Sequence, residues 1–129
     1  MMERARSALR ILLAIAMVGV GITHFTHTIF FERIIPAWLP AHRALALVSG
    51  AIEILLGATI VPERTRKLAS YGLVALYLAV FPANINMLVH HDTLAPDLPV
   101  WGLVARLPMQ VLFIAWALWV GRDGTPVRR

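Results

Sequence analysis

The sequence contains no cysteine among its 129 residues. This absence excludes thiol–disulfide chemistry, a cysteine-bound iron–sulfur cluster and disulfide bonds between loops. Any redox role must therefore depend on a bound cofactor or on a partner. Charged residues are also scarce, at 15% of the chain, and no internal repeat, low-complexity tract or interdomain linker divides it. We therefore expect a single domain, residues 1–129.

Hydrophobic residues are abundant instead, at 59% of the chain, with a mean hydropathy of +0.73. A soluble fold of this size cannot bury so much apolar surface. Four apolar segments, residues 8–28, 44–61, 68–89 and 100–121, each approach the ~20 residues that a helix needs to cross a bilayer. The sequence therefore predicts an all-α fold, an integral membrane bundle of four transmembrane helices. The first segment is predicted to be an uncleaved span, because too short an apolar run precedes its Ala-rich cleavage-like site.

Basic residues flank these segments unevenly. Because lysine and arginine beside a span are retained in the cytoplasm, we expect both termini to be cytoplasmic, in the inner membrane of a bacterium. This distribution accounts for the net charge of +5, so the expected partner is the lipid bilayer, including its anionic lipids, and not nucleic acid. The residues predicted to be cytoplasmic are Arg4, Arg6, Arg10, Arg64, Arg66, Lys67, Arg122, Arg128 and Arg129, and those on the opposite side are Arg33 and Arg43.

Two histidines, His24 and His27, lie near the outer end of the first segment. Their three-residue spacing places them on one face of a helix. Such a pair is suited either to binding a metal ion or to forming hydrogen bonds along the wall of a pocket. No third strong ligand accompanies them, and two imidazoles do not complete a coordination shell. We therefore predict pocket-lining histidines and no metal site.

An acidic residue and an arginine lie at similar depths in the second and fourth segments. Ser49, Glu53 and Gly57 recur every four residues and form a small, polar face of the kind that packs closely against another helix. Glu53 is costly at this depth unless it is protonated or paired. Arg106, one turn before Gln110, is its expected partner. This pair either fixes the helix register or orients a ligand, and we carry both interpretations.

The third segment adds a tyrosine and an asparagine, Tyr77 and Asn84, on one helix face seven residues apart. Pro82 leaves the carbonyl of Leu78 without its helical donor, and Pro108 in the fourth segment has the same effect on another carbonyl. Carbonyls freed in this way are tolerated in a membrane beside a polar cavity or another donor. Residues 29–40, which are apolar and contain two prolines, are expected to lie in the interface as a cap.

These polar residues define one predicted site. By helix rise, its central members lie within ~6 to 15 Å of the outer surface, and we expect them to line a cavity beneath the cap. The predicted ligand-binding residues are His24, His27, Glu53, Tyr77, Asn84, Arg106 and Gln110.

The sequence resembles the DoxX family of small bacterial membrane proteins over nearly its whole length. The resemblance implies a four-helix membrane domain and an association of some family members with thiosulfate oxidation and electron delivery to quinone. Because this chain lacks cysteine, we do not expect it to take part in thiosulfate chemistry. Contact with a quinone or with lipid remains an expectation from the resemblance. The blocks that carry the resemblance are residues 21–25 (GITHF), 36–40 (PAWLP), 49–53 (SGAIE) with Gly57, 81–86 (FPANIN) and 106–110 (RLPMQ).

Two hypotheses of function follow. In the first, the protein is a non-catalytic membrane component that acts with a partner protein or on lipid. In the second, it is a redox accessory subunit that binds a quinone-like or other amphipathic small molecule in the polar pocket. The chain supplies no redox centre of its own, which favours the first hypothesis. A transporter ranks last, because four spans without a repeat offer little machinery for alternating access.

Overall fold

A computed structural model describes residues 1–122 of the chain. Within this range the protein is entirely helical and contains no strand. Four of its helices are long and apolar enough to cross a membrane, so the protein is a multi-pass membrane protein, as the sequence predicts. The helices are α1 (Met2–Thr26), α2 (Thr28–Ile34), α3 (His42–Thr59), α4 (Glu63–Val89), α5 (His91–Leu94) and α6 (Val100–Val120).

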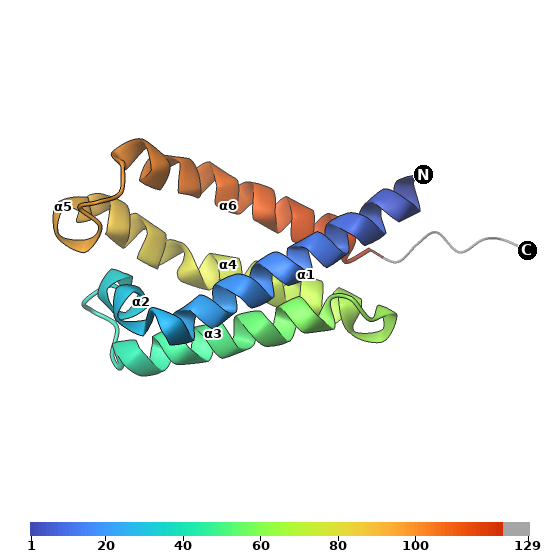
Figure 1. Ribbon diagram of the computed structural model, residues 1–129, viewed down its shortest axis with the longest axis horizontal. Helices are drawn as coiled ribbons and strands as arrows, with labels where there is room; N and C mark the ends of the chain where they lie inside the picture. The colour runs from blue at the N-terminus through green and yellow to red at the C-terminus, as the bar shows by residue number, and fades with distance from the viewer. Residues whose placement is uncertain (123–129) are drawn as a thin grey trace, which may run out of the picture.

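The four long helices form two helical hairpins. α1 packs mainly against α3, and α4 packs mainly against α6, while fewer contacts join α3 to α4 and α1 to α6. Figure 1 shows that α1 begins and α6 ends at the same end of the bundle, whereas α2 and α5 lie at the other end. We call these the terminal end and the loop end. Arg128 and Arg129 lie outside the described residues.

Glycines allow α1 and α3 to approach closely. A Cβ atom added to Gly50 would lie 2.5 Å from the Cβ of His24, and one added to Gly21 would lie 2.9 Å from the carbonyl oxygen of Gly50. A Cβ added to Gly57 would meet the Cβ of Met17 at 2.9 Å. Small residues at such crossings bring two backbones together in a membrane. The close face of α3 therefore centres on Gly50 and Gly57.

Hydrogen bonds between helices fasten the terminal end. Nε of Arg10 donates to the carbonyl of Val120 at 2.9 Å, and the Ser70 hydroxyl donates to the carbonyl of Ala117 at 2.7 Å. Arg10, expected from the sequence to be one of the flanking cytoplasmic charges, is in fact only 4% exposed and lies inside the bundle. Its long side chain satisfies a carbonyl that the last turn of α6 leaves without an intrahelical donor.

The first predicted span is interrupted near the loop end. α1 ends at Thr26, and α2 begins at Thr28 after a break at His27. The Thr28 hydroxyl donates to the carbonyl of His24 at 2.8 Å and so stabilises the end of α1. Part of the predicted cap, residues 29–40, is therefore helical.

Two apolar clusters lie on either side of the middle of the bundle, one toward each end. The cluster at the terminal end contains Leu13, Ala14, Met17, Ile60, Ala69, Leu73, Tyr77, Ala117 and Val120, and the cluster at the loop end contains Ile34, Met87, Ala95 and Leu103.

Candidate functional site

A cavity of about 490 Å³ lies among α1, α3, α4 and α6, beside α2. It brings together six of the seven residues predicted to bind a ligand and surrounds them with apolar side chains. Its polar lining consists of Thr23, His24, Ser49, Glu53, Tyr77, Asn84, Arg106 and Gln110, and its apolar lining consists of Val20, Phe30, Phe31, Ile34, Ile35, Ala46, Leu76, Val80, Ala83, Met109 and Phe113.

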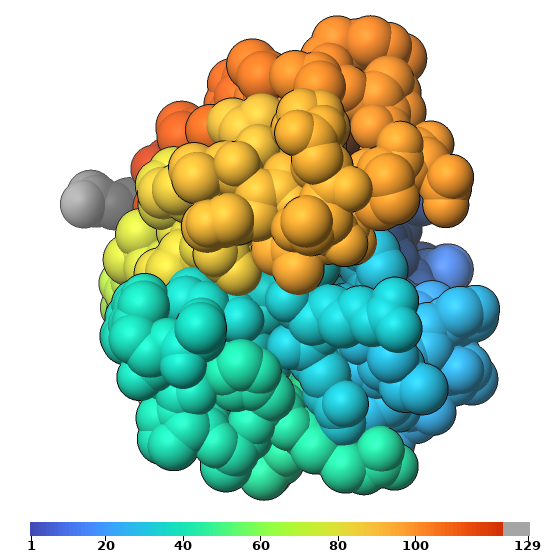
Figure 2. Space-filling view, turned by 90° about the vertical axis from the view of Figure 1, so that its left-hand side faces the viewer, coloured from blue at the N-terminus to red at the C-terminus, as the bar shows by residue number. Residues whose placement is uncertain are grey.

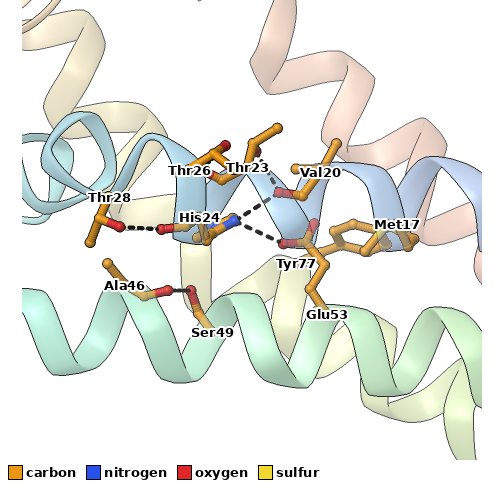
Figure 3. Close-up of polar contacts among 10 residues, drawn as sticks. All are labelled: Met17, Val20, Thr23, His24, Thr26, Thr28, Ala46, Ser49, Glu53 and Tyr77. Atoms are coloured by element: carbon orange, nitrogen blue, oxygen red, sulfur yellow. Dashed lines mark hydrogen bonds and ion pairs between the residues drawn. The ribbon is translucent and has the colours of Figure 1, made fainter.

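His24 and Glu53 form the polar wall of this cavity on the α1–α3 hairpin (Figure 3). Nδ1 of His24 lies 3.4 Å from Oε2 of Glu53 and 3.0 Å from the carbonyl oxygen of Val20. Both neighbours are acceptors, so we assign the proton to Nδ1. The two side chains are only 10% and 12% exposed. The close contact at Gly50 holds His24 against α3 and explains why these two residues meet.

An aromatic ring from the cap fixes the imidazole from its other side. Phe31 of α2 stacks on His24, with ring centroids 3.7 Å apart and planes inclined by 16°. The sequence predicted an apolar cap but did not single out Phe31. The stacking fixes the plane of the imidazole, and within that plane Nδ1 is directed at Glu53 and at the carbonyl of Val20.

Amide side chains form the opposite polar wall, on the α4–α6 hairpin. Nδ2 of Asn84 donates to Oε1 of Gln110 at 2.6 Å, and Nε2 of Gln110 donates to the carbonyl of Tyr77. Tyr77 immediately precedes Leu78, whose carbonyl loses its helical donor to Pro82. Gln110 is only 4% exposed. The sequence correctly placed this part of α4 beside a polar cavity, but the donor from α6 reaches the carbonyl of Tyr77 and not the carbonyl of Leu78 that Pro82 was predicted to free.

The Tyr77 side chain extends toward α1 and joins the two hairpins. Its hydroxyl donates to Sδ of Met17 at 3.1 Å, and its ring is buried beside Phe113. Tyr77 thus closes the cavity on the side of the terminal end, where it also belongs to the apolar cluster.

The expected ion pair between Arg106 and Glu53 does not form. Within residues 1–122 no carboxylate oxygen lies within 4.0 Å of Arg106, and Glu53 is paired with His24 instead. The prediction matched residues by depth alone, whereas α3 packs against α1, α2 and α4, and α6 packs against α4 and α1. Arg106 lines the cavity from α6 and is exposed at its edge.

His27 lies outside the cavity. It occupies the break between α1 and α2, where its Nδ1 contacts the Thr26 hydroxyl at 2.8 Å and its side chain is exposed. The interrupted helix places it on a different side from His24, although an unbroken helix would have aligned them. The part of the chain that the structure describes holds no group of three or more His, Asp or Glu side chains arranged to bind a metal ion.

The pairing observed here predicts which substitutions are coupled. Glu53→Gln and His24→Asn should be non-additive in thermal unfolding, with a coupling of about 1 kcal/mol, because the two side chains are in contact. Glu53→Gln and Arg106→Gln should be additive to within ~0.5 kcal/mol. Double-mutant cycles in one detergent measure both couplings. The reverse order of couplings would contradict the observed geometry.

The fold and the cavity together define a four-span membrane protein with a polar, partly enclosed cavity in its interior. The chain belongs to the family described as a domain of unknown function, DUF8561, whose model matches residues 13–121. This match covers all four long helices in whole or in large part. No curated protein and no solved structure matches the sequence.

Proposed function

We propose that the protein is a non-catalytic membrane component that binds one amphipathic small molecule in the cavity and acts with a membrane partner or on lipid. The observation that carries this proposal is the cavity itself. Its volume of about 490 Å³ lies within the ~300–1,000 Å³ that is usual for small-molecule sites. Its lining is mostly apolar, with a few convergent polar groups, as such sites require.

The route into the cavity supports an amphipathic ligand drawn from the bilayer. Figure 2 shows the loop end covered by α2, the start of α3 and the segment that contains α5. On the side of the bundle, Val20 of α1 and Met109 of α6 both line the cavity and are about half exposed. A molecule dissolved in the surrounding leaflet therefore has access between α1 and α6.

A quinone is the second candidate occupant, in keeping with the resemblance of the sequence to the DoxX family. The cavity presents the His24–Glu53 pair on one hairpin and the amides of Asn84 and Gln110 on the other. Two polar walls facing each other are suited to hydrogen bonds with the two carbonyl oxygens of a quinone ring. In this version the protein is a redox accessory subunit, and the bound quinone supplies the redox chemistry.

Mass spectrometry of molecules retained by the protein tests the proposal. The protein is extracted into lipid nanodiscs, purified and analysed by native mass spectrometry. We expect one bound molecule per chain, identified after its release as either a single-chain amphiphile or a quinone. A chain that carries nothing, and that takes up neither dodecanoate nor a short-chain quinone when these are added, would refute ligand binding.

The orientation is proposed from charge. Among the described residues, the basic side chains predicted to be cytoplasmic lie in the first part of α1, at the start of α4 and just after α6, and these segments are at the terminal end (Figure 1). We therefore place the terminal end in the cytoplasm of a bacterial cell. The cavity, with the cap above it, then faces the outer leaflet.

Single-cysteine labelling measures this orientation, and the natural chain needs no cysteine removed beforehand. We expect Asp92→Cys to react with an impermeant maleimide added outside intact cells, because α5 lies at the loop end. Arg66→Cys should react only after the membrane is opened. Labelling of position 66, and not of position 92, in intact cells would show that the orientation in the membrane is the reverse of the one proposed.

A further inference from the structure

We propose that the molecule bound in the cavity is a single-chain carboxylic acid and that the Arg106 guanidinium binds its carboxylate. This inference rests on the proposed ligand-binding function and specifies the chemical class of the ligand. It begins from the arginine, whose expected partner is engaged elsewhere.

Arg106 brings a permanent positive charge to the edge of the cavity and forms no ion pair with the described residues. No acidic side chain within residues 1–122 lies within ion-pair distance, and Arg106 makes no hydrogen bond with any of these residues. Arginine does not lose its proton in proteins. A cation on a membrane-spanning helix is costly and normally faces a partner or a water-filled space. An anion in the cavity would supply that partner.

Hydrogen-bond donors are in excess on this side of the cavity. The guanidinium has five N–H donors, and each primary amide has two. Asn84 and Gln110 each use one amide N–H in the bonds observed, one to the other's oxygen and one to the carbonyl of Tyr77. A carboxylate accepts hydrogen bonds and donates none, and its two oxygens match the planar fork of arginine. The chemistry of this wall therefore favours a carboxylate over an alcohol or an amine.

The acidic residue of the cavity does not oppose this arrangement. Glu53 lies on the other hairpin, where His24 holds it at 3.4 Å. The ligand's head would therefore lie beside α6 and its Arg106, and the His24–Glu53 pair would remain intact. A like-charged head beside Glu53 would be unfavourable, which further places the carboxylate next to Arg106.

The remaining lining accounts for the chain of the acid. Phe30, Ile34, Leu76, Val80 and Phe113 come from three different helices and surround the space with apolar surface. Burial of methylene groups there contributes ~0.8 kcal/mol for each one removed from water. A ligand that enters from lipid leaves the apolar bilayer interior and not water, so it gains little of this free energy. The apolar surface therefore accommodates the acyl chain, and the head group supplies the selectivity.

Competition between molecules that share one tail tests the head-group preference. The protein is placed in phosphatidylcholine nanodiscs and photolabelled with a dodecanoate that carries a diazirine in its tail. Unlabelled dodecanoate, dodecanol and dodecyltrimethylammonium then compete for the site, and peptide mass spectrometry locates the label. We expect dodecanoate to compete at least tenfold better than dodecanol, and the cationic amphiphile not to compete.

Three variants assign the preference to Arg106. Arg106→Gln should reduce the tenfold preference to near unity, and Arg106→Lys should retain most of it, because the charge remains. Arg33→Gln is the matched control, since it removes a positive charge at the loop end from a residue outside the lining. In this variant, dodecanoate and dodecanol should compete in the same ratio as in the natural protein.

The outcomes separate this inference from the proposed function. Equal competition by dodecanol and dodecanoate, or an unchanged preference in Arg106→Gln, would overturn the carboxylate assignment while leaving ligand binding intact. If no cavity residue is labelled or protected by any of these amphiphiles or by a short-chain quinone, the proposed function itself fails. Should Arg106→Gln not fold, the natural protein and Arg106→Lys decide the question by the competition ratio.

Discussion

Gly50→Leu is expected to lower the melting temperature of the protein in detergent by ~10 °C or more. Even the first atom of a new side chain would lie 2.5 Å from the Cβ of His24 and 3.0 Å from the carbonyl oxygen of Gly21. Overpacking costs ~1–3 kcal/mol in soluble cores, and here the obstacle includes backbone, so the two helices must separate. Thermal unfolding followed by circular dichroism measures the loss.

The control for this substitution lies on α1. Gly19→Leu makes the same chemical change at a position where an added Cβ meets nothing within 4 Å. It should leave the melting temperature within a few degrees of that of the natural protein. Equal losses from both substitutions would show that glycine contributes through the helix backbone and not through the contact between α1 and α3.

Val80→Phe is expected to reduce binding of the cavity ligand at least tenfold without unfolding the protein. Val80 lines the cavity from α4, so a larger side chain there occupies space that a ligand would need. Because the cavity is large compared with the added volume, the fold can accommodate the ring. Photolabelling by the diazirine dodecanoate, with melting temperature measured in parallel, gives both quantities.

The matched control is Val89→Phe. It places the same substitution on the same helix at a residue that is 66% exposed and lies outside the lining. Its labelling should be unchanged. Undiminished labelling in Val80→Phe would mean that the amphiphile binds elsewhere on the bundle.

Hydropathy was sufficient to predict the four spans because a bilayer imposes one length and one composition on every helix that crosses it. The predicted first span continued to residue 28, whereas α1 stops at Thr26. Hydropathy does not register such a break, because it is averaged over a window of ~19 residues and the break is a single residue. The break nevertheless decides where His27 lies.

Six of the seven residues predicted for the site line the cavity, whereas His27 lies outside it and the predicted partner of Glu53 was wrong. Helix rise gives the depth of each residue, and this was enough to bring His24, Glu53, Asn84 and Gln110 to one cavity. The partner of Glu53 depended on which helices are neighbours and on how each is rotated. The choice of neighbouring helices and their rotation follow from the glycine contacts between α1 and α3. Residue spacing along a single helix does not reveal these contacts. The sequence predicted a polar cavity or a donor beside the carbonyl of Leu78, whereas the observed side-chain bond from Gln110 goes to the carbonyl of Tyr77.

The arrangement of two hairpins has a consequence for how the protein is made. The spans enter the membrane in chain order, so α1 and α3 can complete their contacts before α6 has left the ribosome. The boundary between the hairpins is then the last surface to close, and the cavity lies along it, with lining residues from both sides. A molecule held there would contact both halves of the newly made protein. Its binding free energy would favour the closed assembly over the open one.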